Sequence, residues 1–187
     1  MASLADMEEV LRTTPDRYTR TAVLLHWLLA VLIVVMVVLG FYMTEIPRNT
    51  PERAFYFNLH KSLGLLVFML VLVRIVWRIT HPVPELPSSI PLWQRRASAI
   101  SHGLLYVCMV LQPATGYIAS SFSKYGIRFF GIPLPNWGWE DPGLRSIFVA
   151  AHETIVLVFI TLIAIHVLAA LKHALVDRNE VMQRMWL

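Results

Sequence analysis

One long apolar run near the end of the chain, from Ala151 to His166, constrains the possible folds more than any other feature. It reads AHETIVLVFITLIAIH, with histidines at positions 152 and 166. On an α-helix, the 14 steps between them turn through about 1400°, about 40° short of four full turns, so both imidazoles lie on nearly the same face. The same steps rise about 21 Å, most of the ~30 Å hydrocarbon core of a bilayer. We therefore expect one helix to place an imidazole near each surface of a membrane.

The composition places this run in an integral membrane protein. Of the 187 residues, 57% are hydrophobic and 15% are charged, whereas soluble domains are nearer half apolar and a quarter charged. The apolar residues gather in four runs long enough to cross a bilayer as helices, at about 21–43, 56–77, 97–122 and 147–175. The expected fold is all-α, an integral membrane four-helix bundle over residues 21–175 between an N-terminal tail (1–20) and a C-terminal tail (176–187).

The basic residues predict how this bundle is oriented. They are concentrated in the two tails and around the connection between the second and third runs: Arg12, Arg17, Arg20, Arg74, Arg78, Arg95, Arg96, Lys172, Arg178 and Arg184. In the other two connections, acidic residues roughly balance the basic ones. By the positive-inside rule both termini face the cytoplasm. An even number of spans also requires the termini to share a side.

Four histidines on three spans then fall at two depths. His26 begins the first span and lies near the inner surface, at the level of His166. His60 begins the second span, which enters from outside, so it lies near the outer surface at the level of His152. Ionisable side chains at membrane depth are costly and usually functional. We therefore expect two cross-helix pairs, His26 with His166 and His60 with His152.

Paired imidazoles inside a helix bundle are a standard way to hold an iron porphyrin from both faces. Two axial histidines leave no open position on the iron, which suits electron transfer rather than oxygen binding. Zinc would need four ligands around one point. The single cysteine, Cys108, lies inside an apolar run and no Cys-x-x-Cys-His attachment site is present. The pattern predicts two haems, each held by two histidines without a covalent bond.

Three other polar residues of the spans have both a functional and a structural interpretation. His102 falls at the inner level, where a pair already exists, and we expect it to form a hydrogen bond within the bundle or near a haem edge. His173 lies seven residues after His166 and is either an interfacial histidine or a group that binds quinone. Glu153 either orients His152 or is a solvated carboxylate at a helix end.

Basic residues near the ends of the spans have two interpretations as well. Those at the levels where haem propionates would emerge are Arg20, Lys61, Arg74 and Arg78. Guanidinium groups suit carboxylates, but basic side chains at span ends also extend routinely to the membrane surface. Arg20 and Arg74, together with His173, are the candidate cofactor-binding residues besides the four paired histidines.

A series of short motifs runs through almost the whole chain after its N-terminal tail. They are Tyr18-Thr19-Arg20 with His26-Trp27, His60, Val73-Arg74 to Arg78 with Pro82 and Pro84, His102 to Tyr106 to Pro113 to Gly116, Phe130-Gly131 to Pro135, and His152-Glu153-Thr154 with His166 and His173. In this order they resemble the bacterial cytochrome b561 family of small four-helix di-haem membrane cytochromes. The resemblance implies one haem b on His26 and His166 and the other on His60 and His152.

The resemblance also implies a function in the bacterial inner membrane, where the family moves electrons between a donor and quinone. Its best-defined short members act as superoxide oxidases, which pass an electron from periplasmic superoxide through the haems to ubiquinone. Superoxide is a small anion, and basic groups near the outer surface raise its local concentration; Lys124 and Arg128 are therefore the candidate catalytic residues. The expected partners are membrane lipid, quinone, and superoxide or a periplasmic redox protein, with no nucleic acid.

Two other functions are open from the sequence. The first is a cytochrome b anchor subunit that carries electrons between a partner dehydrogenase or hydrogenase and quinone, and docks its partner through the connection at 123–146. The second is a protein without haem that relays or transports protons through its membrane histidines.

Overall fold

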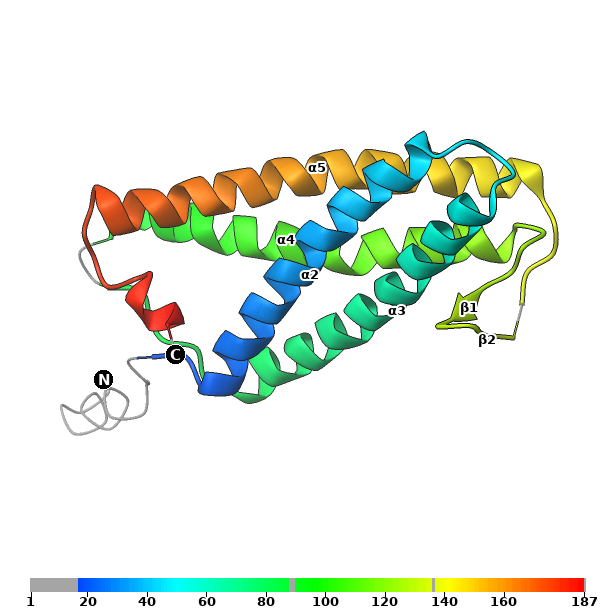
Figure 1. The fold of residues 1–187 in the computed structure, drawn as a ribbon. Helices are drawn as coiled ribbons and strands as arrows, with labels where there is room; N and C mark the ends of the chain where they lie inside the picture. The colour runs from blue at the N-terminus through cyan, green and yellow to red at the C-terminus, as the bar shows by residue number, and fades with distance from the viewer. Residues whose placement is uncertain (1–16, 88–89, 136, 187) are drawn as a thin grey trace.

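Four long helices make up most of the computed structural model, which describes residues 17–87, 90–135 and 137–186. They are α2 (Arg20–Glu45), α3 (Pro51–Thr80), α4 (Leu92–Ser121) and α5 (Pro142–Leu175). Figure 1 shows them as one elongated bundle. Each helix is long and apolar enough to cross a membrane. The expected four-helix membrane bundle is confirmed.

The beginning of α2 and the C-terminal segment lie at the same end of the bundle (Figure 1). The C-terminal segment ends in a short 3₁₀ helix, η1 (Gln183–Met185), which folds back toward the bundle. That this end faces the cytoplasm stays a prediction from the basic residues. The predicted N-terminal tail, residues 1–20, lies mostly outside the described residues.

Local sequence explains where three of the helices begin. Thr19, Thr50 and Asp141 are the N-caps of α2, α3 and α5, and each side chain accepts a hydrogen bond from a backbone N–H three residues later. Pro51 and Pro142 stand in the first turns of α3 and α5, where the N–H that proline lacks has no helical partner in any case.

Helices α3, α4 and α5 begin earlier than the apolar runs predicted, at residues 51, 92 and 142 rather than about 56, 97 and 147. Hydropathy marks the part of a helix that lies in hydrocarbon, whereas caps and first turns are polar and extend beyond it. The connections predicted at 44–55 and 123–146 are consequently too long at their helical ends. Glu52, Arg53 and Arg145 lie on helices and not in loops.

The connection between α4 and α5 contains a β-hairpin, for which the sequence analysis had no prediction. Strand β1 (Arg128–Phe129) pairs antiparallel with β2 (Ile132–Pro133). Positive φ angles at Phe130 (48°) and Gly131 (90°) form the two-residue turn between them, as in the tight hairpins that require left-handed residues.

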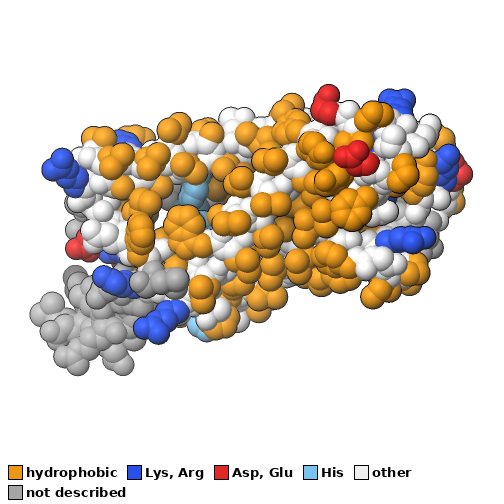
Figure 2. All heavy atoms as spheres, viewed as in Figure 1, with side chains coloured by type: hydrophobic (Ala, Val, Ile, Leu, Met, Phe, Trp, Pro, Cys, Tyr) orange, Lys and Arg blue, Asp and Glu red, His pale blue; other side chains and the backbone are white. Residues whose placement is uncertain are grey.

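Apolar side chains fill the centre of the bundle. One buried cluster is formed by Leu29, Val67 and Val71, and another by Leu105, Cys108 and Phe159. Ile33 and Met109 pack against both clusters. Much of the outer surface is also apolar (Figure 2), as expected where lipid tails replace water around a protein.

Candidate functional site

The structure brings together both predicted histidine pairs. The ring centroids of His26 on α2 and His166 on α5 lie 6.2 Å apart, with 70° between the ring planes. Those of His60 on α3 and His152 on α5 lie 6.3 Å apart, with 80° between the planes. The two separations are nearly equal although the pairs come from different helices and stand at opposite ends of the bundle.

A separation of this size suits two imidazoles that share one metal ion. An imidazole nitrogen lies about 2 Å from a bound metal ion, so rings on opposite sides of the ion have centroids about 6 Å apart. Among the described residues, no group of three or more His, Cys, Asp or Glu side chains is placed to hold a metal ion. Two imidazoles at this separation suit a metal whose other ligands come with it, as the iron of a porphyrin does.

Helix backbone at a glycine stands close to each ring of the outer pair. A Cβ atom added to Gly40 of α2 would lie 3.3 Å from Cε1 of His60, and one added to Gly116 of α4 would lie 3.0 Å from Cε1 of His152. The Nδ1 atom of His60 is buried without a hydrogen-bond partner in the described chain. A buried polar nitrogen without a partner is uncommon, and this one is consistent with a ring whose contacts include a bound group.

His152 is the most firmly held of the four histidines. Its Nδ1 atom lies 2.9 Å from the backbone carbonyl oxygen of Gln112, and because a carbonyl only accepts, Nδ1 is the protonated nitrogen. Nε2 is left with a lone pair, toward which the side-chain amide of Gln112 donates a hydrogen bond of 3.0 Å. The carbonyl anchor leaves Nε2 as the nitrogen that can bind a metal ion.

At the inner level, Arg74 and His102 stand beside the pair. The guanidinium of Arg74 donates hydrogen bonds to Nδ1 of His26 (3.3 Å) and to the carbonyl oxygen of Ala22 (2.8 Å). The ring of His102 lies 5.3 Å from that of His166, closer than rings that share an ion, and its Nδ1 is 3.3 Å from Oγ of Ser98. This is the hydrogen bond within the bundle that was expected of His102.

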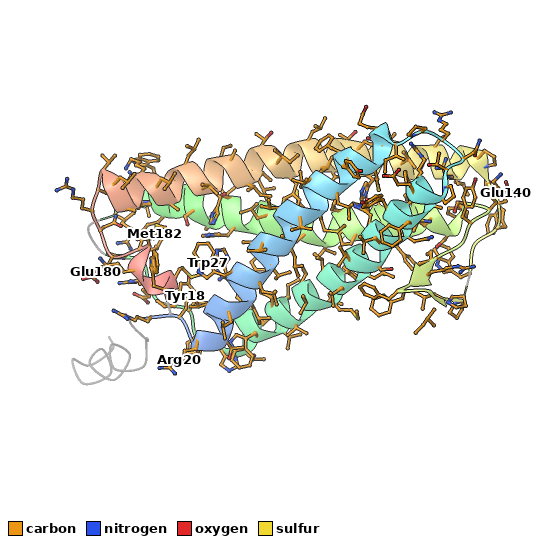
Figure 3. The ribbon with its side chains drawn as sticks, viewed as in Figure 1. Tyr18, Arg20, Trp27, Glu140, Glu180 and Met182 are labelled. Carbon is orange, nitrogen blue, oxygen red and sulfur yellow. The ribbon has the colours of Figure 1, made fainter. Side chains whose placement is uncertain are left out.

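Helices α2 and α5 leave a hollow between them at the inner level. The close helix contacts of the bundle are α2 with α3, α3 with α4, and α4 with α5. Figure 2 shows a hollow between α2 and α5, rimmed by apolar side chains and with a histidine at its floor. The C-terminal segment borders it, because Nε1 of Trp27 donates a hydrogen bond of 2.9 Å to the carbonyl oxygen of Met185, and Figure 3 shows Trp27 pointing toward that segment.

The remaining inner candidates lie apart from the rings. Arg20 is exposed in the first turn of α2. Nδ1 of His173 lies 2.9 Å from Oδ2 of Asp177 and 2.9 Å from Nδ2 of Asn179, so this histidine is part of the C-terminal end of α5. The hydrogen bond from the ammonium of Lys172 (2.6 Å), with a smaller contribution from His173, lowers the pKa of Asp177 below its ordinary value.

At the outer end, the structure separates the two candidate catalytic residues. Lys124 lines an open pocket of about 220 Å³ together with Tyr125, Glu140 and Arg145. Arg128 is exposed on the hairpin and is not among the residues that line this pocket. The positively charged neighbour of Lys124 is therefore Arg145, which the sequence analysis placed in the loop and did not single out as a site residue.

The hairpin itself is held against α3 directly after His60. Nζ of Lys61 donates a hydrogen bond of 3.1 Å to the carbonyl oxygen of Gly126. Oγ of the buried Ser62 accepts one of 2.9 Å from the backbone N–H of Phe130. The two residues of α3 that follow His60 thus connect the outer histidine pair to the hairpin and to the segment just before it. Lys61 has a structural contact here that the sequence did not reveal.

Gln112 is the residue near the histidines that sequence reasoning missed, whereas Gly116 is one of the motif residues and the structure places it against His152. Of the two interpretations of Glu153, the structure agrees with the solvated carboxylate, because Glu153 is exposed and makes no hydrogen bond to the His152 ring among the described residues. The sequence feature that could have pointed to Gln112 is a polar amide within an apolar run, next to Pro113 and four residues before Gly116. That signal does not say which histidine the amide would meet.

The sequence from residue 17 to residue 187 matches the model of a family described as prokaryotic cytochrome b561. Cytochrome b561 homolog 2 of Escherichia coli (strain K12) is 30% identical to the chain, and the match covers 92% of each protein. Cytochrome b561 homolog 1 of the same organism is 23% identical over 91% of the chain and 97% of its own length. A protein of Yersinia pestis named probable superoxide oxidase CybB is 22% identical over 90% of the chain and 95% of its own length.

Proposed function

Because the chain belongs to the prokaryotic cytochrome b561 family of haem b-binding electron carriers of the bacterial inner membrane, we propose that it holds two haems b and passes single electrons between them. His26 and His166 hold the inner haem, and His60 and His152 hold the outer haem. The observation that carries this proposal is the pair of matched ring separations, 6.2 and 6.3 Å, at opposite ends of one bundle.

Gln112 and Arg74 influence how the rings of His152 and His26 can act as haem ligands. When bound, each haem supplies an iron that takes up and releases one electron. The carbonyl of Gln112 keeps the proton of His152 on Nδ1 and its Nε2 available. If His26 bound iron through Nε2, its proton would lie on Nδ1 and Arg74 would no longer donate there, so Arg74 and Arg20 would be the residues that hold carboxylates of the inner haem.

The apolar centre of the bundle determines what can move between the two sites. The Leu29 and Phe159 clusters fill the space between the outer and inner levels. A packed apolar layer holds no ordered water unless polar groups are present to bind it. Electrons can therefore pass through this layer while protons are kept out of it, which is the selectivity that an electron carrier needs.

The proposed donor is superoxide at the outer surface, and the proposed acceptor is ubiquinone. Lys124 and Arg145 line an open pocket at that end together with Glu140, and the excess of basic over acidic groups attracts a small anion; the related Yersinia pestis protein is named probable superoxide oxidase. The hollow between α2 and α5 has an apolar rim (Figure 2), which suits entry of a lipid-soluble quinone from the membrane.

An anchor subunit for a partner dehydrogenase is the second candidate function. The observation that favours it is the exposed apolar surface around the hairpin, where Tyr125, Ile132 and Trp139 are 72%, 65% and 63% exposed. Aromatic side chains are enriched where proteins dock. A soluble redox subunit that co-purifies with the chain would support this function. Rapid ubiquinol formation by the isolated chain supplied with superoxide would support the first.

The haem count per chain tests the proposal directly. We expect two haems b in the purified protein, one in His152→Ala and one in His166→Ala, and two in the control His102→Ala. The reduced-minus-oxidised absorption spectrum, with haem extracted and quantified, gives these numbers. A count of one haem per wild-type chain would rule out one of the two proposed ligand pairs. A colourless protein would favour a proton-relay function instead.

A further inference from the structure

The side chain and the backbone of Gln112 both contact the ring of His152, from the opposite helix. The backbone carbonyl oxygen accepts a hydrogen bond from Nδ1 at 2.9 Å. The side-chain amide nitrogen donates to Nε2 at 3.0 Å. One residue of α4 therefore occupies both nitrogens of a histidine on α5, and Nε2 is the nitrogen through which His152 would bind iron.

The rest of α4 supports this arrangement. Oγ1 of Thr115 lies 3.3 Å from Nδ1 of His152 and belongs to the same turn as the Gln112 carbonyl. Gly116 allows the ring to approach the backbone, because a Cβ there would lie 3.0 Å from Cε1 and 3.1 Å from Nδ1 of the ring. The ring thus lies in a socket formed by Gln112, Thr115 and Gly116, which we call the α4 socket.

The amide of Gln112 is poorly satisfied in this position. Its Oε1 atom is buried and has no hydrogen-bond partner among the described residues. A buried amide oxygen without a partner is unfavourable, so contact with His152 is the only described hydrogen bond that compensates for burial of this side chain. Iron bound at Nε2 would remove that contact as well.

We propose that Gln112 is the positioning residue of the outer haem site, in two opposing ways. Its carbonyl orients His152 with Nε2 available, and its amide competes with iron for that nitrogen. The outer haem is consequently held less tightly than the ligand pair alone would allow. This inference rests on the proposed function, because it requires a haem on His60 and His152.

The inner pair offers an internal comparison. In the described structure the ring of His166 makes no hydrogen bond, and the contact of Arg74 with His26 is to Nδ1 and not to Nε2. The chemistry of the α4 socket therefore affects one haem of the two. Changes in Gln112 should alter the outer haem and leave the inner haem unchanged.

The test uses the full-length chain in lipid nanodiscs, with His26→Ala present so that only the outer haem is bound. The rate of haem transfer to apomyoglobin is compared for Gln112→Leu, Gly116→Ala and the control Gln94→Leu, which makes the same change elsewhere on α4. Leucine is chosen because the sulfur of methionine can itself bind haem iron. The absorption spectrum of each variant checks that both axial histidines are retained.

We expect haem loss to slow roughly fivefold in Gln112→Leu, about the effect of one neutral hydrogen bond. Haem loss should become faster in Gly116→Ala, because the added methyl group moves the ring away from the carbonyl, and it should not change in Gln94→Leu. A purely structural role for the socket predicts faster loss in both socket variants. Equal rates for Gln112→Leu and Gln94→Leu, or faster loss in Gln112→Leu, would overturn the proposal. A His26→Ala protein with no haem would instead contradict the proposed function itself.

Discussion

The guanidinium of Arg74 on α3 donates a hydrogen bond of 3.3 Å to Nδ1 of His26 on α2. A guanidinium group has only donors, so neutral His26 carries its proton on Nε2 in this arrangement. A histidine that binds a metal ion through Nε2 carries its proton on Nδ1. If His26 binds the proposed inner haem through Nε2, Arg74 has to leave Nδ1, while its contact with the Ala22 carbonyl keeps its positive charge beside that histidine.

Removal of that charge should lower the midpoint potential of the inner haem. A nearby positive charge favours the reduced iron. For a partly buried charge the effect is on the order of 1–2 kcal/mol, or about 40–90 mV for one electron. We expect a decrease of this size in Arg74→Leu and little change in Arg74→Lys. Potentiometric titration of the two haems measures it, with the exposed Arg96→Leu as the control. A shift confined to the outer haem would contradict the assignment.

Substitution of Gly40 should weaken the outer site through His60. The added methyl group would lie 3.3 Å from Cε1 of His60, so the ring has to move by a few tenths of an ångström. Gly40→Ala should therefore lower the occupancy of the outer haem, as measured by haem per chain. Gly103 has no atom within 4 Å of an added Cβ, and Gly103→Ala should keep full haem and stabilise its helix by up to about 1 kcal/mol.

Phe159 lies on α5 midway between the two histidine levels. It lies seven residues from His152 and seven from His166, and is 4% exposed. Phe159→Ala should lower the free energy of unfolding by about 3–5 kcal/mol, because it leaves a cavity in a packed cluster. Leu157 on the same helix is 60% exposed, and Leu157→Ala should change stability by no more than about 0.5 kcal/mol. Unfolding in mixed micelles measures both variants.

The end of α5 should loosen in acid. Because contacts with Lys172 and His173 lower the pKa of Asp177, this carboxylate stabilises the folded segment above its ordinary pKa of about 3.9, and the stabilisation is lost as the pH falls through the lowered value. Hydrogen exchange of residues 176–186 should accelerate at that point. Asp177→Asn should remove the pH dependence, whereas Glu180→Gln should keep it; acceleration near neutral pH would indicate another group.

The spans and the histidine levels could be predicted from the sequence because both depend on local periodicity and on the thickness of a bilayer. A helix repeats every 3.6 residues wherever it lies, so His152 and His166 had to share a face. The family resemblance, the four-helix membrane bundle and the membrane location followed from the same residues, and they are confirmed. Haem binding by the four histidines stays a prediction, supported by the ring separations of 6.2 and 6.3 Å.

Contacts between helices could not be derived in this way. Gln112 contacts His152 across 40 positions of sequence, and Arg145, not Arg128, shares a pocket with Lys124 because the connection returns to the end of α4. Such contacts depend on how helices rotate and approach, which composition and spacing do not determine. The sequence alone thus determined that His152 and His166 face one side of a membrane helix. Only the tertiary structure decided which side chains surround each ring, because those partners lie on other helices.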